Sequence, residues 1–348
     1  MTTTAGQPIR LAYRHPQVRP EALVASLLPP KRFERVRFDT YVPDEAEPTQ
    51  AAALRELRDF AGTLAGGARR ASWWHRGARP ARRPGRYLDG GYGVGKTHLL
   101  ASLWHEAPWP KAYCTFSELT HLVGALGFPE AGRQLSDHRL LAIDEFELDD
   151  VGDTVLISTL LGRLADGGVA LAVTSNTLPD RLGEGRFAAQ DFLREIQGLA
   201  ARFAVVRIEG QDYRHRGLPP APEPVDDETL AALAAAQPGA ALDDFADLCG
   251  HLASLHPVRY GDLLAGVSGV FWRGVTPVAD QSTALRVVVL ADRMYDSEVP
   301  VTTSGTPFDE LFPPELLSGG YRKKYLRAVS RLIALTREGD SVGRGQSA

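Results

Sequence analysis

The segment GGYGVGKT, residues 90–97, matches the phosphate-binding pattern G-x-x-x-x-G-K-[ST] at every position. Glycines let the backbone fold so tightly that several N–H groups point at one phosphate, and the helix that follows adds its positive N-terminal end. We expect the Lys96 ammonium to reach the β- and γ-phosphates and the Thr97 hydroxyl to bind magnesium. The predicted nucleotide contacts are Gly90, Gly91, Tyr92, Gly93, Val94, Gly95, Lys96, Thr97 and His98.

The residues on either side of this segment support the same prediction. The apolar pair Tyr87–Leu88 is typical of a strand, and His98–Trp104 has a helical pattern. A glycine-rich loop between a strand and a helix is the context in which this pattern binds phosphate. A chance match is therefore a poor explanation of the segment.

A second motif, LLAIDE at residues 140–145, ends an apolar run in two adjacent acids. We expect Asp144 to hold magnesium through its water shell and Glu145 to polarise the water that attacks the γ-phosphate. Two acids after a buried strand could instead cap the next helix. The distance along the chain between the phosphate-binding segment and these acids is plausible for this class of site, so it favours the catalytic interpretation over the helix cap. The paired acids also favour additional-strand ATPases over kinases and GTPases, and the chain has no N-K-x-D motif for guanine.

A third feature, VTSN at residues 173–176, places polar side chains at the end of another apolar run. We expect Asn176 to face the γ-phosphate and to orient the attacking water together with Glu145. The alternative is a plain strand-to-turn exit, since Ser and Asn favour turns. The two preceding motifs make a γ-phosphate sensor the better interpretation.

Apolar runs and helical patterns alternate between residues 84 and 210. The expected strands are Arg86–Leu88, Ala112–Thr115, Leu140–Ile143, Val169–Thr174 and Ala204–Ile208, and the expected helices are Lys96–Trp104, Phe116–Leu126, Val151–Ala165 and Phe192–Ala201. This alternation predicts an α/β fold, a parallel P-loop sheet with helices on both faces. The carboxyl ends of its strands share one edge, where ligands bind.

The chain divides by composition into six sections. They are an N-terminal helical segment of the ATPase module at 1–65, an arginine-rich insertion at 66–86, the nucleotide-binding core at 87–214, a linker at 215–226, a smaller and mainly helical lid region at 227–337, and a disordered tail at 338–348. In the lid region we expect helices at 227–236, 242–254, 259–266, 283–295 and 322–336, a strand at 269–275 and an extended segment at 299–303.

Composition excludes several classes of protein. Lys and Arg number 39 against 43 Asp and Glu, for a net charge of -4, so the chain as a whole is not a general nucleic-acid binder. Two cysteines, Cys114 and Cys249, cannot build a disulfide framework. The N-terminus has no apolar segment like that of a secretory signal, and no apolar run in the chain has the length of a membrane span. We expect a cytoplasmic protein.

The arginine-rich section has two interpretations. It holds seven arginines and no acid, and its glycines and prolines disfavour a regular element. A solvated insertion is the simpler interpretation. A docking surface for an acidic partner, anionic lipid or nucleic acid is the alternative, because Trp73 and Trp74 could stack on bases.

Arginines complete many nucleotide sites. Arg186, Arg194 and Arg202 follow the fourth expected strand, where oligomeric ATPases place an arginine that acts on a neighbouring subunit. Arg286 lies on a helix of the lid region and could contact the phosphates in cis. A surface ion pair is the commoner role of any one arginine.

Several segments together resemble the ZapE-type cell-division ATPases, a branch of the AAA+ superfamily with mitochondrial relatives. They are LLAIDEFELDDVGD at 140–153, TSNTLP at 174–179, FLREIQGL at 192–199, QDYR at 211–214, FADLC at 245–249, LRVVVLADRMYD at 285–296 and AVSRL at 328–332. The resemblance covers about residues 20–335. It implies ATP and Mg²⁺ as cofactors and assembly into a ring or transient homo-oligomer.

The resemblance also implies a partner and a place in the cell. The partner would be FtsZ or another protein of the division machinery, reached by recruitment to the inner face of the membrane at the division site. In this family an arginine usually stands where this chain has Ala189, so Arg186 is our assignment for the trans-acting arginine and Arg194 the alternative. A nucleic-acid-coupled ATPase, such as a helicase loader, and a scaffold with little turnover are the alternative functions.

Overall fold

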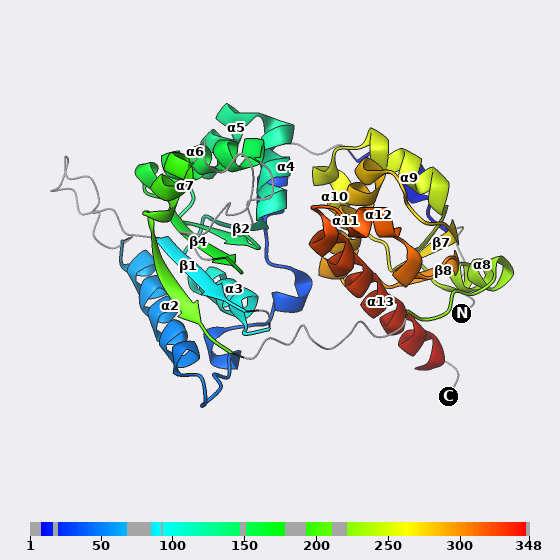
Figure 1. Cartoon of the computed structure of the whole chain (residues 1–348), viewed down its shortest axis with the longest axis horizontal. Helices are drawn as coiled ribbons and strands as arrows, with labels where there is room; N and C mark the ends of the chain where they lie inside the picture. The colour runs from blue at the N-terminus through cyan, green and yellow to red at the C-terminus, as the bar shows by residue number, and fades with distance from the viewer. Residues whose placement is uncertain are drawn as a thin grey trace. The chain divides into compact units, whose positions relative to one another are not determined.

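A computed structural model describes residues 8–16, 20–67, 85–91, 93–146, 151–177, 193–210 and 221–345. The chain forms two compact units. The core unit is Arg19–Arg216, and the carboxy-terminal unit joins Met1–Val18 to Gly217–Ala348. Figure 1 shows the helices and strands of both.

The core unit contains a five-stranded parallel sheet in the order β2-β3-β4-β1-β5. Its strands are β1 (Gly85–Gly90), β2 (Lys111–Thr115), β3 (Leu140–Asp144), β4 (Ala170–Ser175) and β5 (Phe203–Ile208). β4 lies between β1 and β3, so a strand separates the phosphate-binding segment from the acidic pair. The additional-strand sheet predicted from the sequence is therefore confirmed.

Helices cover both faces of this sheet, with α2 and α3 on one face and α6 and α7 on the other (Figure 1). The helices of the unit are α1 (Pro20–Ala25), α2 (Pro48–Gly67), α3 (Lys96–Glu106), α4 (Phe116–Leu126), α5 (Phe128–Leu135), α6 (Val151–Gly167) and α7 (Leu193–Ala200). Every residue of β3 is buried, which explains why it is apolar up to its final acid. Because all five strands are parallel, their carboxyl ends lie along the same edge of the sheet.

Local hydrogen bonds set where the helices begin. Thr115 caps α4, because its side chain accepts the N–H of Glu118 while the Glu118 carboxylate accepts the N–H of Thr115. In the first turn of α2, the Thr49 hydroxyl accepts the N–H of Glu209 just after β5, at 2.9 Å. That bond joins α2 to the far end of the sheet.

The carboxy-terminal unit contains a second parallel sheet in the order β6-β7-β8. Its strands are β6 (Ala240–Asp244), β7 (Gly269–Val275) and β8 (Val301–Gly305), and its helices are α8 (Asp227–Ala236), α9 (Phe245–Ser254), α10 (Tyr260–Leu263), α11 (Gln281–Asp296), α12 (Pro314–Leu317) and α13 (Arg322–Gly345). Its core is centred on Trp272, which is fully buried between Phe245 and Phe308. The expected strand at 269–275 and helix at 227–236 have the predicted bounds.

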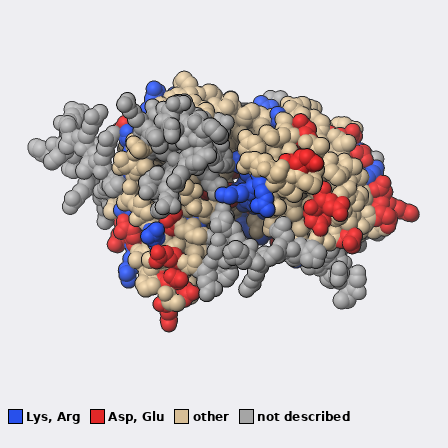
Figure 2. Space-filling view, viewed as in Figure 1, with Lys and Arg blue, Asp and Glu red and all other residues tan. Residues whose placement is uncertain are grey.

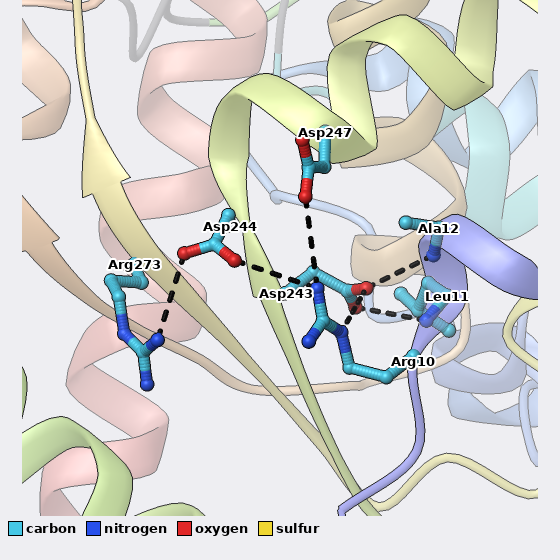
Figure 3. Close-up of polar contacts among 7 residues, drawn as sticks. All are labelled: Arg10, Leu11, Ala12, Asp243, Asp244, Asp247 and Arg273. Atoms are coloured by element: carbon cyan, nitrogen blue, oxygen red, sulfur yellow. Dashed lines mark hydrogen bonds and ion pairs between the residues drawn. The ribbon is translucent and has the colours of Figure 1, made fainter.

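The first described residues belong to this carboxy-terminal unit. Ile9 forms a β-bridge with Ala241. The buried Asp243 carboxylate accepts the N–H groups of Leu11 and Ala12 at 2.9 and 3.0 Å, and the Arg10 guanidinium lies against it (Figure 3). The first residues of the segment 1–65, predicted to belong wholly to the ATPase module, are therefore grouped with the carboxy-terminal unit instead.

Several elements differ from the sequence-based expectations. β6 takes the residues expected to begin a helix at 242, because buried Ala241 and partly buried Leu242 pair with β7. α13 continues to Gly345, so the expected disordered tail at 338–348 is helical over most of its length. α5 was not predicted. Among the described residues, no helix is both long and apolar enough to span a bilayer.

Candidate functional site

The phosphate-binding segment leaves β1 at Gly90 and enters α3 at Lys96. Gly93 and Gly95 have φ values of 83° and 88°, which L-residues with a side chain rarely adopt. A Cβ added to Gly90 would lie 2.2 Å from the Ile208 carbonyl oxygen, and one added to Gly95 would lie 2.5 Å from the Tyr41 ring. Side chains at these two positions would collide with Ile208 and Tyr41, which pack against the loop, so the conformation of the loop requires glycine.

The Lys96 ammonium lies inside this loop. It donates to the carbonyl oxygens of Gly90 and Gly91 at 2.7 and 2.5 Å, and to Asn176 Oδ1 at 2.9 Å. Asn176 follows β4, which is the neighbour of β1 in the sheet. The structure therefore brings the predicted phosphate lysine and the predicted γ-phosphate sensor into direct contact.

Asp144 ends β3 at the same edge and is buried. Its Oδ1 accepts from the Thr97 hydroxyl at 3.3 Å and from the Thr174 hydroxyl, and its Oδ2 accepts from the Tyr113 hydroxyl at 2.9 Å. The two predicted magnesium ligands, Thr97 and Asp144, thus lie side by side. Tyr113 and Thr174 were not predicted, because no pattern marks a single hydroxyl on a neighbouring strand.

Glu145, the predicted base, follows in a left-handed backbone conformation with φ 52°. Its N–H is shared between Asp144 Oδ1 at 3.1 Å and the Thr174 hydroxyl at 3.0 Å. Glu145 is half-buried, whereas its neighbour Phe146 is fully buried. The backbone turn thus leaves the Glu145 side chain partly accessible at the sheet edge.

A segment before α2 supports the loop from outside. The Tyr41 hydroxyl donates to the Val94 carbonyl at 2.9 Å, and burial raises the pKa of Tyr41 above its usual value of 10.0. Tyr41 also packs edge-on against the His98 ring, whose Nε2 lies 3.0 Å from Thr40 Oγ1. His98 therefore contacts this segment in the structure. Tyr41 is a further residue of the site, and no pattern of residue types in the sequence marks it.

The oxygen atoms at the sheet edge suit magnesium. The described residues contain no group of three or more His, Cys, Asp or Glu side chains that could hold a metal by themselves. Mg²⁺ in nucleotide sites needs no such group, since it binds one or two protein oxygens, the substrate phosphates and water. The adjacent Thr97 and Asp144 oxygens, next to a loop shaped for phosphate, fit that requirement.

The predicted arginines have varied positions. Arg202 makes a two-pronged ion pair with Asp166, with its closest N–O distance at 2.6 Å. Arg286 belongs to the carboxy-terminal unit, where its guanidinium donates to the carbonyls of Leu252 and Leu255 at 2.9 and 3.0 Å. Arg186 and Tyr92 lie outside the described residues, and Arg194 is described only as part of the α7 backbone.

This arrangement defines a class of protein. A phosphate loop after β1, an acidic pair after β3 and an intervening strand between them are the features of the additional-strand P-loop ATPases. Within that class, the chain belongs to the AFG1-like ATPase family, whose model matches residues 18–237 and 231–344. The match supports the resemblance to ZapE-type ATPases at the level of an AAA+ P-loop family.

More distant similarities are weaker. An uncharacterised protein of Schizosaccharomyces pombe is 27% identical over 153 residues, which cover 39% of this chain and 34% of that protein. AMPPCP-bound DnaA of Aquifex aeolicus is 13% identical with a TM-score of 0.38, covering 51% of this chain and 50% of DnaA. The DnaC helicase loader is 18% identical with a TM-score of 0.34, covering 51% of this chain and 99% of DnaC. The chain thus spans about a third of the yeast relative and half of that DnaA.

Proposed function

We propose that this chain binds ATP with magnesium and hydrolyses it. The observation that carries the proposal is the 3.3 Å approach of the Thr97 hydroxyl to the Asp144 carboxylate, at the mouth of a loop in which glycine is sterically required. Both residues were predicted magnesium ligands from separate motifs, and the sheet brings them together. The family match supports the same activity.

Each residue has a separate task in this proposal. The backbone N–H groups of the loop and the Lys96 ammonium bind the phosphates, and Thr97 and Asp144 hold the metal. Bound magnesium would neutralise charge on the β- and γ-phosphates. Glu145 accepts a proton from the attacking water, and Asn176 orients that water and contacts the γ-phosphate. Arg186 acting in trans and Arg286 acting from the lid remain part of the proposal.

Two substitutions test this assignment of roles. Lys96→Ala should abolish tight binding of a fluorescent ATP analogue, because it removes the cation inside the loop. Glu145→Gln should retain binding and lose phosphate release. Two matched controls lie in the carboxy-terminal unit: Lys323→Ala removes an exposed lysine, and Glu298→Gln changes an exposed glutamate that also has a positive φ, 54°. A Glu145→Gln protein that turns over ATP at the parent rate would show that Glu145 is not the base.

We further propose that hydrolysis remodels a protein partner. The resemblance to ZapE-type ATPases supports a partner in the division machinery, with FtsZ as the first protein to test, and supports a transient homo-oligomer in the cytoplasm at the division site. Purified FtsZ should raise the rate of ATP hydrolysis, and Glu145→Gln should retain FtsZ in the presence of ATP but not without it. An unchanged rate together with no ATP-dependent retention would remove FtsZ from the proposal.

A nucleic-acid-coupled ATPase is the alternative. Its support is the arginine-rich section at 66–86, of which residues 68–84 lie outside the described part of the chain. On the face shown in Figure 2, the described surface of the carboxy-terminal unit carries several groups of acidic side chains as well as basic ones. Single-stranded DNA that binds at low salt, with affinity falling steeply as salt rises, and that stimulates hydrolysis would favour this alternative. The absence of binding at low salt would reject it.

A further inference from the structure

The hydroxyl of Thr174 lies between the two acids of the site. Thr174 is on β4, is 2% exposed, and comes two residues before Asn176. Its hydroxyl donates to Asp144 Oδ1 and accepts the N–H of Glu145 at 3.0 Å. A hydroxyl has one proton to donate and lone pairs to accept, so one atom serves both neighbours at once.

The backbone of Thr174 holds the same turn from its other side. Its carbonyl accepts the N–H of Phe146 at 2.7 Å. The N–H groups of Glu145 and of the next residue, Phe146, therefore both bond to Thr174. Between these two bonds, Glu145 has a φ of 52°. A left-handed conformation at a residue other than glycine is uncommon and persists only where surrounding contacts impose it. Here the contacts on both sides come from Thr174.

Tyr113 provides an internal comparison. Its hydroxyl donates to Asp144 Oδ2 at 2.9 Å from β2, on the opposite side of β3. Tyr113 and Thr174 thus fix the two oxygens of one carboxylate from the two neighbouring strands. In the described hydrogen bonds, the Thr174 hydroxyl contacts both Asp144 and Glu145, whereas the Tyr113 hydroxyl contacts Asp144.

We propose that Thr174 is a positioning residue for both acids: it orients the Asp144 carboxylate toward Thr97 and holds the backbone turn from which Glu145 faces the reacting water. The inference rests on the proposed ATPase function. Groups that orient a ligand carboxylate typically contribute 10- to 100-fold to metal affinity or activity. Because the same hydroxyl also sets the base, its removal affects the chemical step even when magnesium is saturating.

The test compares Thr174→Val with Thr174→Ser in the full-length chain. Valine keeps the β-branched shape and removes the hydroxyl, whereas serine keeps the hydroxyl. For each variant, kcat, KM for ATP, the magnesium concentration at half-maximal rate and the affinity for a fluorescent ATP analogue are measured, together with thermal unfolding. Thr336→Val is the matched control, since it removes a buried threonine hydroxyl that bonds the Leu332 carbonyl within α13.

Thr174→Val should lower kcat by roughly 10- to 100-fold at saturating magnesium while nucleotide affinity stays close to that of the parent. Thr174→Ser should restore most of kcat. Tyr113→Phe should chiefly raise the magnesium requirement, because it removes the hydroxyl that donates to Asp144 Oδ2. Thr336→Val should keep the parent kcat.

Several results would overturn the inference. One is a parent-like kcat for Thr174→Val, and another is an equal loss in Thr174→Ser, because then the hydroxyl is not the cause. If Thr174→Val does not fold, Thr174→Cys against Thr174→Ser makes the same comparison with a weak thiol donor in place of the hydroxyl. Failure of the proposed function shows separately, as a parent protein whose ATP hydrolysis is absent or unaffected by Lys96→Ala; the inference falls with it.

Discussion

Replacing Gly95 by alanine should damage the phosphate loop through two independent effects. The φ of 88° at Gly95 costs an L-residue about 1–2 kcal/mol. The new Cβ would also lie 2.5 Å from Tyr41, so the ring must move. Moving it breaks the hydrogen bond from the Tyr41 hydroxyl to the buried Val94 carbonyl, which costs about 1–3 kcal/mol. The combined penalty is roughly 2–5 kcal/mol.

This penalty is distributed between folding and binding. If the folded loop keeps its shape, stability falls by the whole amount. If the loop relaxes, the conformation that binds phosphate must be restored at the expense of affinity, and Kd for the nucleotide rises by roughly 30-fold to several thousandfold. Urea unfolding and titration with a fluorescent ATP analogue measure the two parts, and their sum should reach the predicted range.

Gly62→Ala is the matched control for this prediction. Gly62 lies inside α2, and a Cβ added there meets no heavy atom within 4 Å. Alanine in a helix interior should stabilise the protein by about 0.5–1 kcal/mol and leave nucleotide affinity unchanged. Parent-like stability and affinity in Gly95→Ala would refute the steric argument.

Three further predictions follow from contacts of single side chains. Tyr41→Phe removes the donor to the Val94 carbonyl and should lower stability by about 1–3 kcal/mol, measured by urea unfolding, with weaker nucleotide binding in the same titration. Asp243→Ala leaves the N–H groups of Leu11 and Ala12 without their acceptor; it should destabilise the chain by roughly 2–6 kcal/mol and speed tryptic cleavage near Arg10. Burial raises the pKa of Cys249 from 9.0 to about 11, so the folded state holds the thiol proton more tightly than the unfolded state. Stability should therefore fall as pH rises through that window, and Cys249→Ala should reduce the fall in urea unfolding measured across it.

Much of the core fold follows from the sequence, because buried parallel strands leave a strong apolar signal. The five strands of the core sheet lie within one to two residues of their expected bounds. β6 is the instructive exception. Its sequence AALDD contains two acids, and a polar ending suggests a helix start when the strand beside it is unknown. Asp243 is buried only because residues far away in the sequence supply its donors, Leu11 and Ala12.

The candidate site likewise contains residues that could be predicted from the sequence and residues that could not. Residues that would touch phosphate, metal or water could be predicted from the sequence, because the chemistry allows few side chains at each position. The residues that hold them, Tyr41, Tyr113 and Thr174, each supply a single hydroxyl from another part of the chain. Many side chains can supply one hydrogen bond, so no pattern of residue types marks these positions. Only the strand order, which sets β2 and β4 beside β3, explains why two of these hydroxyls converge on Asp144.

Arg286 shows the converse case, a residue whose phosphate contact stays a prediction and whose contacts within its own unit are known. Its guanidinium donates to the carbonyls that end α9, at Leu252 and Leu255, and lies 3.5 Å from the Tyr260 hydroxyl. Carbonyls at a helix carboxyl end carry partial negative charge, so this is a favourable place for a cation. A phosphate contact from Arg286 would have to replace these bonds with stronger ones in which the donor and the acceptor are both charged. Nucleotide binding would then weaken the hold of α11 on α9, and the lid role and the structural role of Arg286 would compete for the same guanidinium.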